Sequence, residues 1–92
     1  MIIRIMGDGQ YTVNSSLFDA LNAIDNEIVE IVQRGDDEQF KKRLSDLIGL
    51  IQKEGQRVSD LELVESDVIV PPADMILVEA RDVFTGTGIF EG

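Results

Sequence analysis

Two runs of apolar residues at helical spacing, joined by a short polar step, constrain the fold of this chain more than any other feature. The first run has a four-three-four-three spacing, which places its members on one helix face: Leu17, Leu21, Ile24, Ile28 and Ile31. The second run repeats a helical spacing further along the chain: Phe40, Leu44, Leu47, Ile48 and Ile51. Between the runs, Arg34 and Gly35 fit the end of one helix, and Asp36 fits the N-cap of the next. So short a joint predicts an antiparallel helical hairpin.

The first of these helices is expected to present a wide apolar surface. Candidates for its N-cap are supplied by Asn14-Ser15-Ser16. Three further apolar residues, Phe18, Val29 and Val32, widen the seam to an arc of about 160°, at 100° per residue. The arc adds to an apolar surface that is larger than a minimal core needs.

The chain opens with an alternating stretch, "MIIRIMGDGQYTV", which predicts a β-hairpin. A three-residue turn at Gly7-Asp8-Gly9, with Gly9 in the left-handed conformation, puts four large residues on one face: Ile3, Ile5, Tyr11 and Val13. A two-residue turn at Asp8-Gly9 would mix the two faces. Because register follows the pattern that keeps one face buried, the three-residue turn is preferred. A lone hairpin is marginal in water, so its apolar face must pack on something.

The second half of the chain is less regular. Residues 56–70 predict a loop with at most one short strand, although "VIV" before Pro71-Pro72 must end in an extended conformation. The prolines then start a predicted third helix. Its apolar face comprises Ile76, Leu77, Ala80, Val83 and Phe84.

These elements predict a single small α+β domain over residues 1–85, in which the N-terminal β-hairpin packs on the antiparallel helical hairpin, with a third, C-terminal helix. Residues 86–92, "GTGIFEG", predict a flexible C-terminal tail with one apolar pair, Ile89-Phe90.

Charge and missing residue types narrow the function. The chain has 8 Lys and Arg against 18 Asp and Glu, a formal charge of −10, which repels nucleic acid and anionic membranes. There is no cysteine and no histidine, so the chain lacks thiolate chemistry and the commonest general base. The apolar stretches are far shorter than the roughly 20 residues of a spanning helix. "MIIRIM" lacks the features of an export signal, so we expect a cytoplasmic protein with no direct membrane insertion.

No group of residues in the sequence forms a convincing reactive centre. The serines have no histidine partner. Carboxylates that could hold Mg²⁺ are better explained as solvated helix faces or first-turn residues: Asp19, Asp25, Glu27, Glu30, Asp36, Asp37 and Glu38. The one basic run, Lys41-Lys42-Arg43, fans around a helix amid negative charge, which is not a nucleic-acid patch. We therefore expect no enzymatic activity, no cofactor, no metal and no nucleic-acid partner.

With no reactive centre in the sequence, we expect the function to depend on binding through the protein surface. One interpretation is that the domain's own elements consume all the apolar residues. The other is that one face or the tail docks a partner, by packing a helix in a groove or by adding a strand. The candidate partner-binding residues are Phe18, Val29, Val32, Val78, Ile89 and Phe90.

The opening stretch, the segment "SDVIVPPAD" and a terminal helix together resemble the PspA-associated protein (PspAA) family over essentially the whole chain. This resemblance implies a non-enzymatic accessory to PspA. PspA is a coiled-coil protein related to ESCRT-III components, which guards membrane integrity in the phage shock response. The resemblance brings no catalytic residues to this sequence. It implies that the chain reaches the inner face of the membrane through its partner.

Two other classes of function stay open at this point, and so does self-association into a homo-oligomer. An acidic antitoxin-like protein or nucleic-acid mimic would titrate a basic partner, and its binding would depend strongly on salt. A small carboxylate-dependent metal enzyme would need acids that converge in a cleft.

Overall fold

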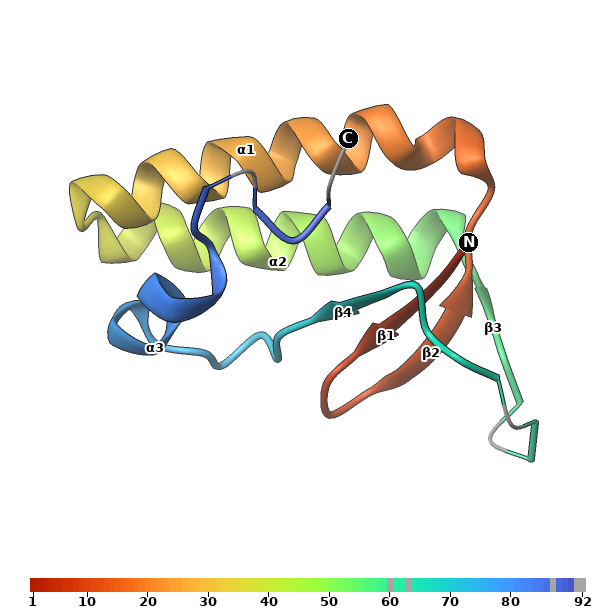
Figure 1. The fold of residues 1–92 in the computed structure, drawn as a ribbon. Helices are drawn as coiled ribbons and strands as arrows, with labels where there is room; N and C mark the ends of the chain where they lie inside the picture. Colours follow the sequence, from red (N-terminus) through yellow and green to blue (C-terminus); the bar gives the residue numbers. More distant parts are fainter. Residues whose placement is uncertain (60, 63, 87, 91–92) are drawn as a thin grey trace.

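The computed structural model of the chain describes residues 1–59, 61–62, 64–86 and 88–90. These residues form an α+β fold of two layers, a mixed four-stranded sheet and a helical hairpin that covers one of its faces, with a short third helix (Figure 1). The elements are β1 Ile2–Ile5, β2 Gly9–Thr12, a 3₁₀ turn Ser15–Leu17, α1 Phe18–Arg34, α2 Asp37–Glu54, β3 Gln56–Arg57, β4 Val68–Val70 and α3 Leu77–Val83. The predicted fold class is confirmed.

The helical hairpin forms where the sequence predicts it. Asn14 caps the 3₁₀ turn that leads into α1, its Oδ1 accepting a hydrogen bond from the Ser16 N–H at 2.9 Å. Gly35 ends α1 at a φ of 75°, in the left-handed conformation. Asp36 then caps α2, its Oδ1 accepting from the Gln39 N–H at 3.2 Å. All five seam residues of α2 are buried.

The N-terminal hairpin is present, but its predicted turn is wrong. The structure pairs Ile3 with Tyr11 and Ile5 with Gly9, so the turn is residues 6–8 and the positive φ of 84° belongs to Gly7. The Asp8 N–H donates to the Ile5 carbonyl at 3.0 Å and closes this turn. Because the pairing is displaced by two residues, every side chain keeps its predicted face, and the four expected residues are buried.

Two strands form in residues 56–70, where the sequence predicts a loop with at most one short strand. β4 pairs in parallel with β1, with Val70 opposite Ile5, and β3 pairs antiparallel with β2, giving the strand order β3-β2-β1-β4. The extended conformation expected before the prolines is thus confirmed. It serves to add a strand to the edge of the hairpin, and the Met6 N–H donates to the Val70 carbonyl at 2.9 Å.

The third helix begins later than predicted. The Met75 N–H donates to the Pro72 carbonyl at 3.1 Å, which makes a turn after the prolines, and Ile76 is extended (φ −92°, ψ 158°). As a result Ile76 is half exposed, although it was predicted to lie on the buried face. Ala80 and Phe84 are buried as predicted, and Phe84 packs edge-on against Phe40 of α2, with ring centroids 6.0 Å apart.

The chain after α3 returns along α1 (Figure 1). The predicted flexible tail over 86–92 includes residues 87, 91 and 92, which lie outside the described residues. Among the described ones, Phe90 is fully buried and its ring packs edge-on against Phe18 at 6.3 Å. Ile89 is half-buried against the core. The apolar pair of this segment therefore extends the core of the domain.

Candidate functional site

Exposed apolar side chains indicate where the described surface has a candidate site for binding a partner or ligand. Five large ones are exposed among the described residues: Met6, Leu61, Ile69, Ile76 and Val78. Four of the five come from the β1–β2 turn, from β4 and from the α3 segment, which lie on the same side of the molecule, below the helical hairpin in Figure 1. This clustering makes that side the candidate site.

A hollow with a volume of about 740 Å³ lies at this place. Most of its lining residues are apolar, and we call it the apolar groove, formed by Met6, Ile69, Pro71, Pro72, Met75 and Val83. Gly7 and Asp74 complete the lining. A groove of this size is within the range of ligand-binding clefts and is wide enough for several side chains.

The fold explains how these residues meet. Val70 and Ile5 point toward the core, so their neighbour Ile69 faces the other side of the sheet, next to its pairing partner Arg4. A turn after the prolines leads the chain from β4 to α3, and α3 brings Val83 to the groove. Met6 enters from the β1–β2 turn. Three separate segments therefore build one apolar surface.

A smaller hollow of about 350 Å³ adjoins the groove, and Asp8 is among the residues that line it. Asp8 accepts hydrogen bonds from Gln52 Nε2 (2.9 Å), from the Tyr11 hydroxyl (2.9 Å) and from Arg57 Nη1 (2.8 Å). The hydrogen bond from Gln52, and then that from Tyr11, lower the pKa of Asp8. Burial, and then the hydrogen bond to Asp8, raise the pKa of Tyr11. All these contacts tie β2, α2 and β3 together, so this cluster is structural.

Asp25, which the sequence offered as one of several metal-binding acids, is fully buried on α1. Its Oδ1 accepts from the Ile89 N–H at 3.2 Å and its Oδ2 from the Phe90 N–H at 2.8 Å. Burial raises the pKa of Asp25, and these two hydrogen bonds act against that rise. Asp25 therefore fastens the C-terminal segment. Within the described ranges, no three Asp or Glu side chains are arranged to hold a metal ion.

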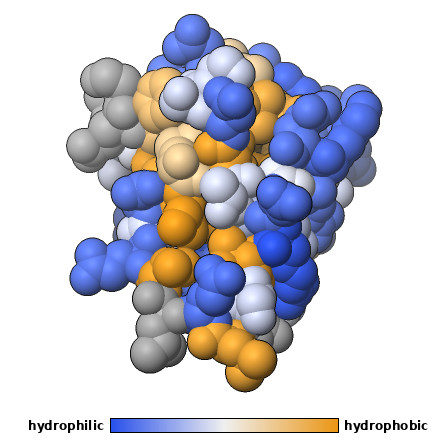
Figure 2. Space-filling model, turned by 90° about the vertical axis from the view of Figure 1, so that its right-hand side faces the viewer, coloured by the Kyte–Doolittle hydropathy of each residue, from blue (hydrophilic) through white to orange (hydrophobic). Residues whose placement is uncertain are grey.

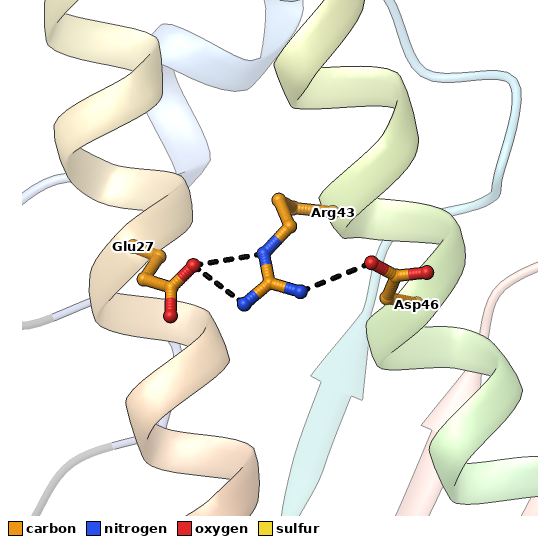
Figure 3. A network of polar contacts seen from close by, with 3 residues as sticks. All are labelled: Glu27, Arg43 and Asp46. Atoms are coloured by element: carbon orange, nitrogen blue, oxygen red, sulfur yellow. Dashed lines mark hydrogen bonds and ion pairs between the residues drawn. The ribbon is translucent and has the colours of Figure 1, made fainter.

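The basic run on α2 is occupied by ion pairs in the structure. Arg43 donates to Glu27 of α1 through Nε at 2.8 Å and to Asp46 through Nη1 at 3.0 Å (Figure 3). The bond to Glu27, and then that to Asp46, raise the pKa of Arg43. Lys41 lies 3.4 Å from Asp37. Two of the three bases thus have acidic neighbours within their own helical hairpin.

The six predicted partner-binding residues do not form one surface. Val29, Val32 and Phe90 are buried in the core, and in this conformation they offer no surface to a partner. Phe18 and Ile89 are half-buried against that core. Val78 is exposed, on the helix that brings Val83 to the groove.

Sequence reasoning missed the residues of the apolar groove. One signal was present, because alternation along "VIV" exposes Ile69 if its neighbours are buried. The proximity of Met6 and Met75 had no local signal.

The opposite end of the molecule is a weaker candidate. Figure 2 shows apolar side chains there in a broken band between hydrophilic ones. The N-terminus, β3 and the loop that holds Leu61 lie at this end (Figure 1). Leu61 is exposed, but residues 60 and 63 beside it lie outside the described residues, so no site is built on it.

Comparison with known proteins gives a match over the full length of the chain. The family model described as "PspAA: PspA-Associated protein" matches residues 1–92. No curated protein and no solved structure gives a significant match.

Proposed function

The chain belongs to the PspA-associated protein family, and from this membership we propose that it is a non-catalytic accessory protein that binds a PspA-like protein in the response to membrane stress. The observation that carries the proposal is the family match over residues 1–92. The partner is a coiled-coil protein of the ESCRT-III-related class, and binding to it would bring this chain to the inner face of the membrane.

The apolar groove is the surface that we propose for this contact. Exposed apolar patches flanked by polar residues are typical of protein-binding sites. Ile69, which lines the groove, is 57% exposed, so it would lose considerable contact with water on binding. Of the six residues predicted from the sequence, none is among the described residues that line the groove; Val78 is exposed on α3, the helix that also carries Val83. As the proposed binding surface, the residues of the apolar groove therefore replace Val29, Val32 and Phe90, which are buried.

An accessory role agrees with the contacts of the perturbed acids. Among the described residues, Asp8 and Asp25 are the carboxylates with clearly shifted pKa values, and each is bonded within the fold. Perturbed acids at an active site would instead converge on one cleft that a substrate could enter, whereas of these two only Asp8 lines a hollow, the smaller one. Asp25 is fully buried against the C-terminal segment.

Attachment to the membrane is proposed to be indirect. None of the helices in the described part of the chain has both the length and the apolar character that crossing a bilayer requires. The formal charge of −10 opposes binding to anionic lipid. We propose that the chain acts in the cytoplasm and reaches the membrane only through its partner.

The test is binding to the PspA-like protein encoded in the same genome. The two proteins are mixed at micromolar concentrations and resolved by size-exclusion chromatography with light scattering, and the affinity is measured by calorimetry. We expect a complex, and we expect Ile69→Asp to weaken it by about tenfold or more, as for a central interface residue.

Leu61→Asp is the matched control, because it places the same charge on an equally apolar, exposed side chain outside the groove. It should leave the affinity unchanged. Separate elution of the two unmodified proteins would contradict the proposed function. Equal loss in both variants would contradict the proposed surface.

One alternative is favoured by a specific observation, the charge of −10. An acidic mimic or antitoxin-like protein would bind a basic partner mainly through charge, so its affinity would fall steeply with salt and would be insensitive to Ile69→Asp. The same calorimetry at two ionic strengths separates this alternative from binding through the apolar groove.

A further inference from the structure

We propose that the apolar groove accepts the apolar face of a cationic amphipathic helix, an inference that rests on the proposed function for the identity of the protein that supplies the helix. The proposal follows from the side chains that line the groove, from the charges around it and from the poor match of the groove to other occupants.

The lining suits a helix face. Pro71 and Pro72 give a stiff wall, because each has a fixed φ and a rigid ring. Met6 and Met75 give an adaptable wall, since a methionine side chain is flexible and polarizable and fits apolar surfaces of different shapes. Methionine-rich apolar grooves are a known way of binding amphipathic helices, whose large residues recur on one face every three or four positions.

The charges around the groove favour a cationic occupant. Asp74 lines the groove and, in the described part of the chain, has no ion-pair partner. Glu79 and Asp82 are exposed on α3. No Lys or Arg is among the described residues that line the groove. The formal charge of the whole chain, −10, adds a long-range attraction for cations.

Arg81 and Arg4 are basic residues on or next to elements that build the groove, and their positive charges would oppose a cationic occupant if they lay beside it. Arg81, on α3, lies near the joint of α1 and α2, where a Cβ placed on Gly35 would be 3.7 Å from its Nη2. Arg4 is the pairing partner of Ile69 and is exposed on the same face of the sheet. Arg4 therefore lies beside the groove residue Ile69, which makes it a useful probe of the proposal.

A strand is a poorer occupant than a helix. β4 is an edge strand of only three residues, Val68–Val70. In a parallel pair the hydrogen-bonding residues alternate, so Val70 bonds toward β1 and Ile69 directs its N–H and C=O to the free edge. The next two residues, Pro71 and Pro72, have no N–H to donate. An added strand would gain few main-chain hydrogen bonds, whereas a helix needs only the apolar side chains.

A second copy of this chain and a lipid surface are also poorer occupants. The acidic residues around the groove, Asp74, Glu79 and Asp82, form what we call the acidic rim. Two copies that met through their grooves would bring two acidic rims together, and the repulsion between like charges makes this unfavourable. An anionic membrane would be repelled by the same charge.

The test uses designed peptides labelled with fluorescein, and the Kd is measured by fluorescence anisotropy. The probe is a Leu/Lys peptide of about 18 residues, five helical turns, with leucine on one face. One comparison peptide has Glu in place of Lys, and another has the same composition with strict alternation of Leu and Lys, which favours a strand. We expect binding in the micromolar range by the helical cationic peptide and at least about tenfold weaker binding by the other two.

Variants of the protein separate docking in the groove from simple charge attraction. Ile69→Asp adds a negative charge, so charge attraction alone predicts tighter binding of the cationic peptide, whereas docking predicts a loss of about tenfold or more. Asp74→Lys should weaken binding, and Arg4→Glu should strengthen it severalfold. Circular dichroism and thermal unfolding check that each variant stays folded. Should Ile69→Asp fail to fold, Met75→Ala replaces it, with a smaller expected loss.

Several outcomes would overturn the proposal. These are equal or tighter binding of the alternating peptide, tighter binding in Ile69→Asp, binding to vesicles of phosphatidylglycerol that Ile69→Asp abolishes, and a dimer in light scattering that the same variant dissociates. Binding of the PspA-like protein without binding of the cationic peptide would overturn this inference and leave the proposed function standing. The reverse result would overturn the proposed function and leave the chemistry of the groove standing.

Discussion

At the scale of single residues, Asp25 shows how a charge can be kept inside a small core. A buried carboxylate is unfavourable unless its oxygens accept hydrogen bonds. Both oxygens of Asp25 are satisfied by consecutive main-chain N–H groups, those of Ile89 and Phe90. Gly88 allows this approach, because its φ is 85° and a Cβ at this position would overlap the Asp25 carboxylate. One acid and one glycine thus fix the end of the described chain.

The close approach at Gly88 can be tested against a neighbouring glycine. Gly86 also has a positive φ, 57°, but no atom lies within 4 Å of the position of a Cβ. Gly86→Ala should therefore cost only the backbone term, about 1–2 kcal/mol. Gly88→Ala should cost at least about 1 kcal/mol more, because it also pushes the carboxylate away from its two donors. Urea unfolding measures both. Equal costs would show that the contact between Gly88 and Asp25 contributes nothing.

The two perturbed carboxylates should affect stability with opposite dependence on pH. The folded-state pKa of Asp25 is raised above 3.8, so Asp25 stabilises the fold most when protonated, and this contribution is lost as pH rises through the folded-state pKa. The pKa of Asp8 is lowered from 3.8, so its contribution is present above that pH and is lost as pH falls.

Urea unfolding of Asp25→Asn and Asp8→Asn between about pH 3 and pH 7 checks these signs. Relative to the unmodified protein, Asp25→Asn should gain stability as the pH rises, and Asp8→Asn should lose it. Parallel curves for the two variants would contradict the assignment.

At the scale of elements, the N-terminal hairpin shows which part of a register a sequence determines. The alternation of apolar residues fixes the parity of the pairing, because only even displacements keep Ile3 and Tyr11 on the buried face. It does not choose between even displacements. The structure selects the one in which Gly7 takes the positive φ and in which Asp8 can bond to Tyr11 and Arg57. Those bonds involve β3, which the local pattern did not predict.

This difference in register gives a direct test. In the observed turn Gly7→Ala should cost about 1–2 kcal/mol, because alanine is strained at a φ of 84°. Gly9→Ala should cost less, since Gly9 has no positive φ and a Cβ would meet only the end of the Arg57 side chain, at 2.9 Å, which can shift at the cost of part of its contact with Asp8. The predicted register, with Gly9 in the left-handed conformation, requires the opposite order. Urea unfolding of the two variants decides between the registers.

The helices and β4 differ in how far the sequence could define them. The α1–α2 hairpin depends on local signals, such as the left-handed Gly35 and the Asp36 cap, and both are where the sequence placed them. The prolines predicted the start of α3, but the chain first makes a turn from Pro72 to Met75, so the helix begins only at Leu77. The pairing of β4 with β1 joins residues more than 60 positions apart, so nothing within either segment indicated it.

At the scale of the whole molecule, the candidate site is a product of the topology. The apolar groove draws Met6 from the first hairpin, Ile69 from the edge strand and Val83 from α3. The sequence identified spare apolar residues, but it assigned Val32 and Phe90 to a partner when the domain's own core uses them. Its charge, in contrast, was known at once from the composition. Charge adds up over a chain, whereas a surface requires the contacts that only the fold supplies.

The charge and the groove should act on different rate constants of partner binding. Long-range attraction mainly sets the association rate, and buried apolar contacts mainly set the dissociation rate. Replacing Glu79 and Asp82 on α3 by Lys should therefore slow association severalfold and change dissociation little. Met75→Ala, in the groove, should do the reverse. Stopped-flow measurements with the PspA-like protein resolve the association and dissociation rates. Raising the salt concentration from about 0.05 to 0.5 M should reduce only the association rate.

The location of the charge can be separated from its amount. Asp19 and Glu54 are exposed where α1 begins and α2 ends, whereas α3 approaches the opposite end of this hairpin, near Gly35. Replacing Asp19 and Glu54 by Lys changes the net charge by the same amount as the α3 pair does. If the field around the groove steers the partner, the α3 pair must slow association more than the distant pair. Equal slowing by both pairs would mean that only the total charge matters, and it would remove the acidic rim from the account of how the partner is recognised.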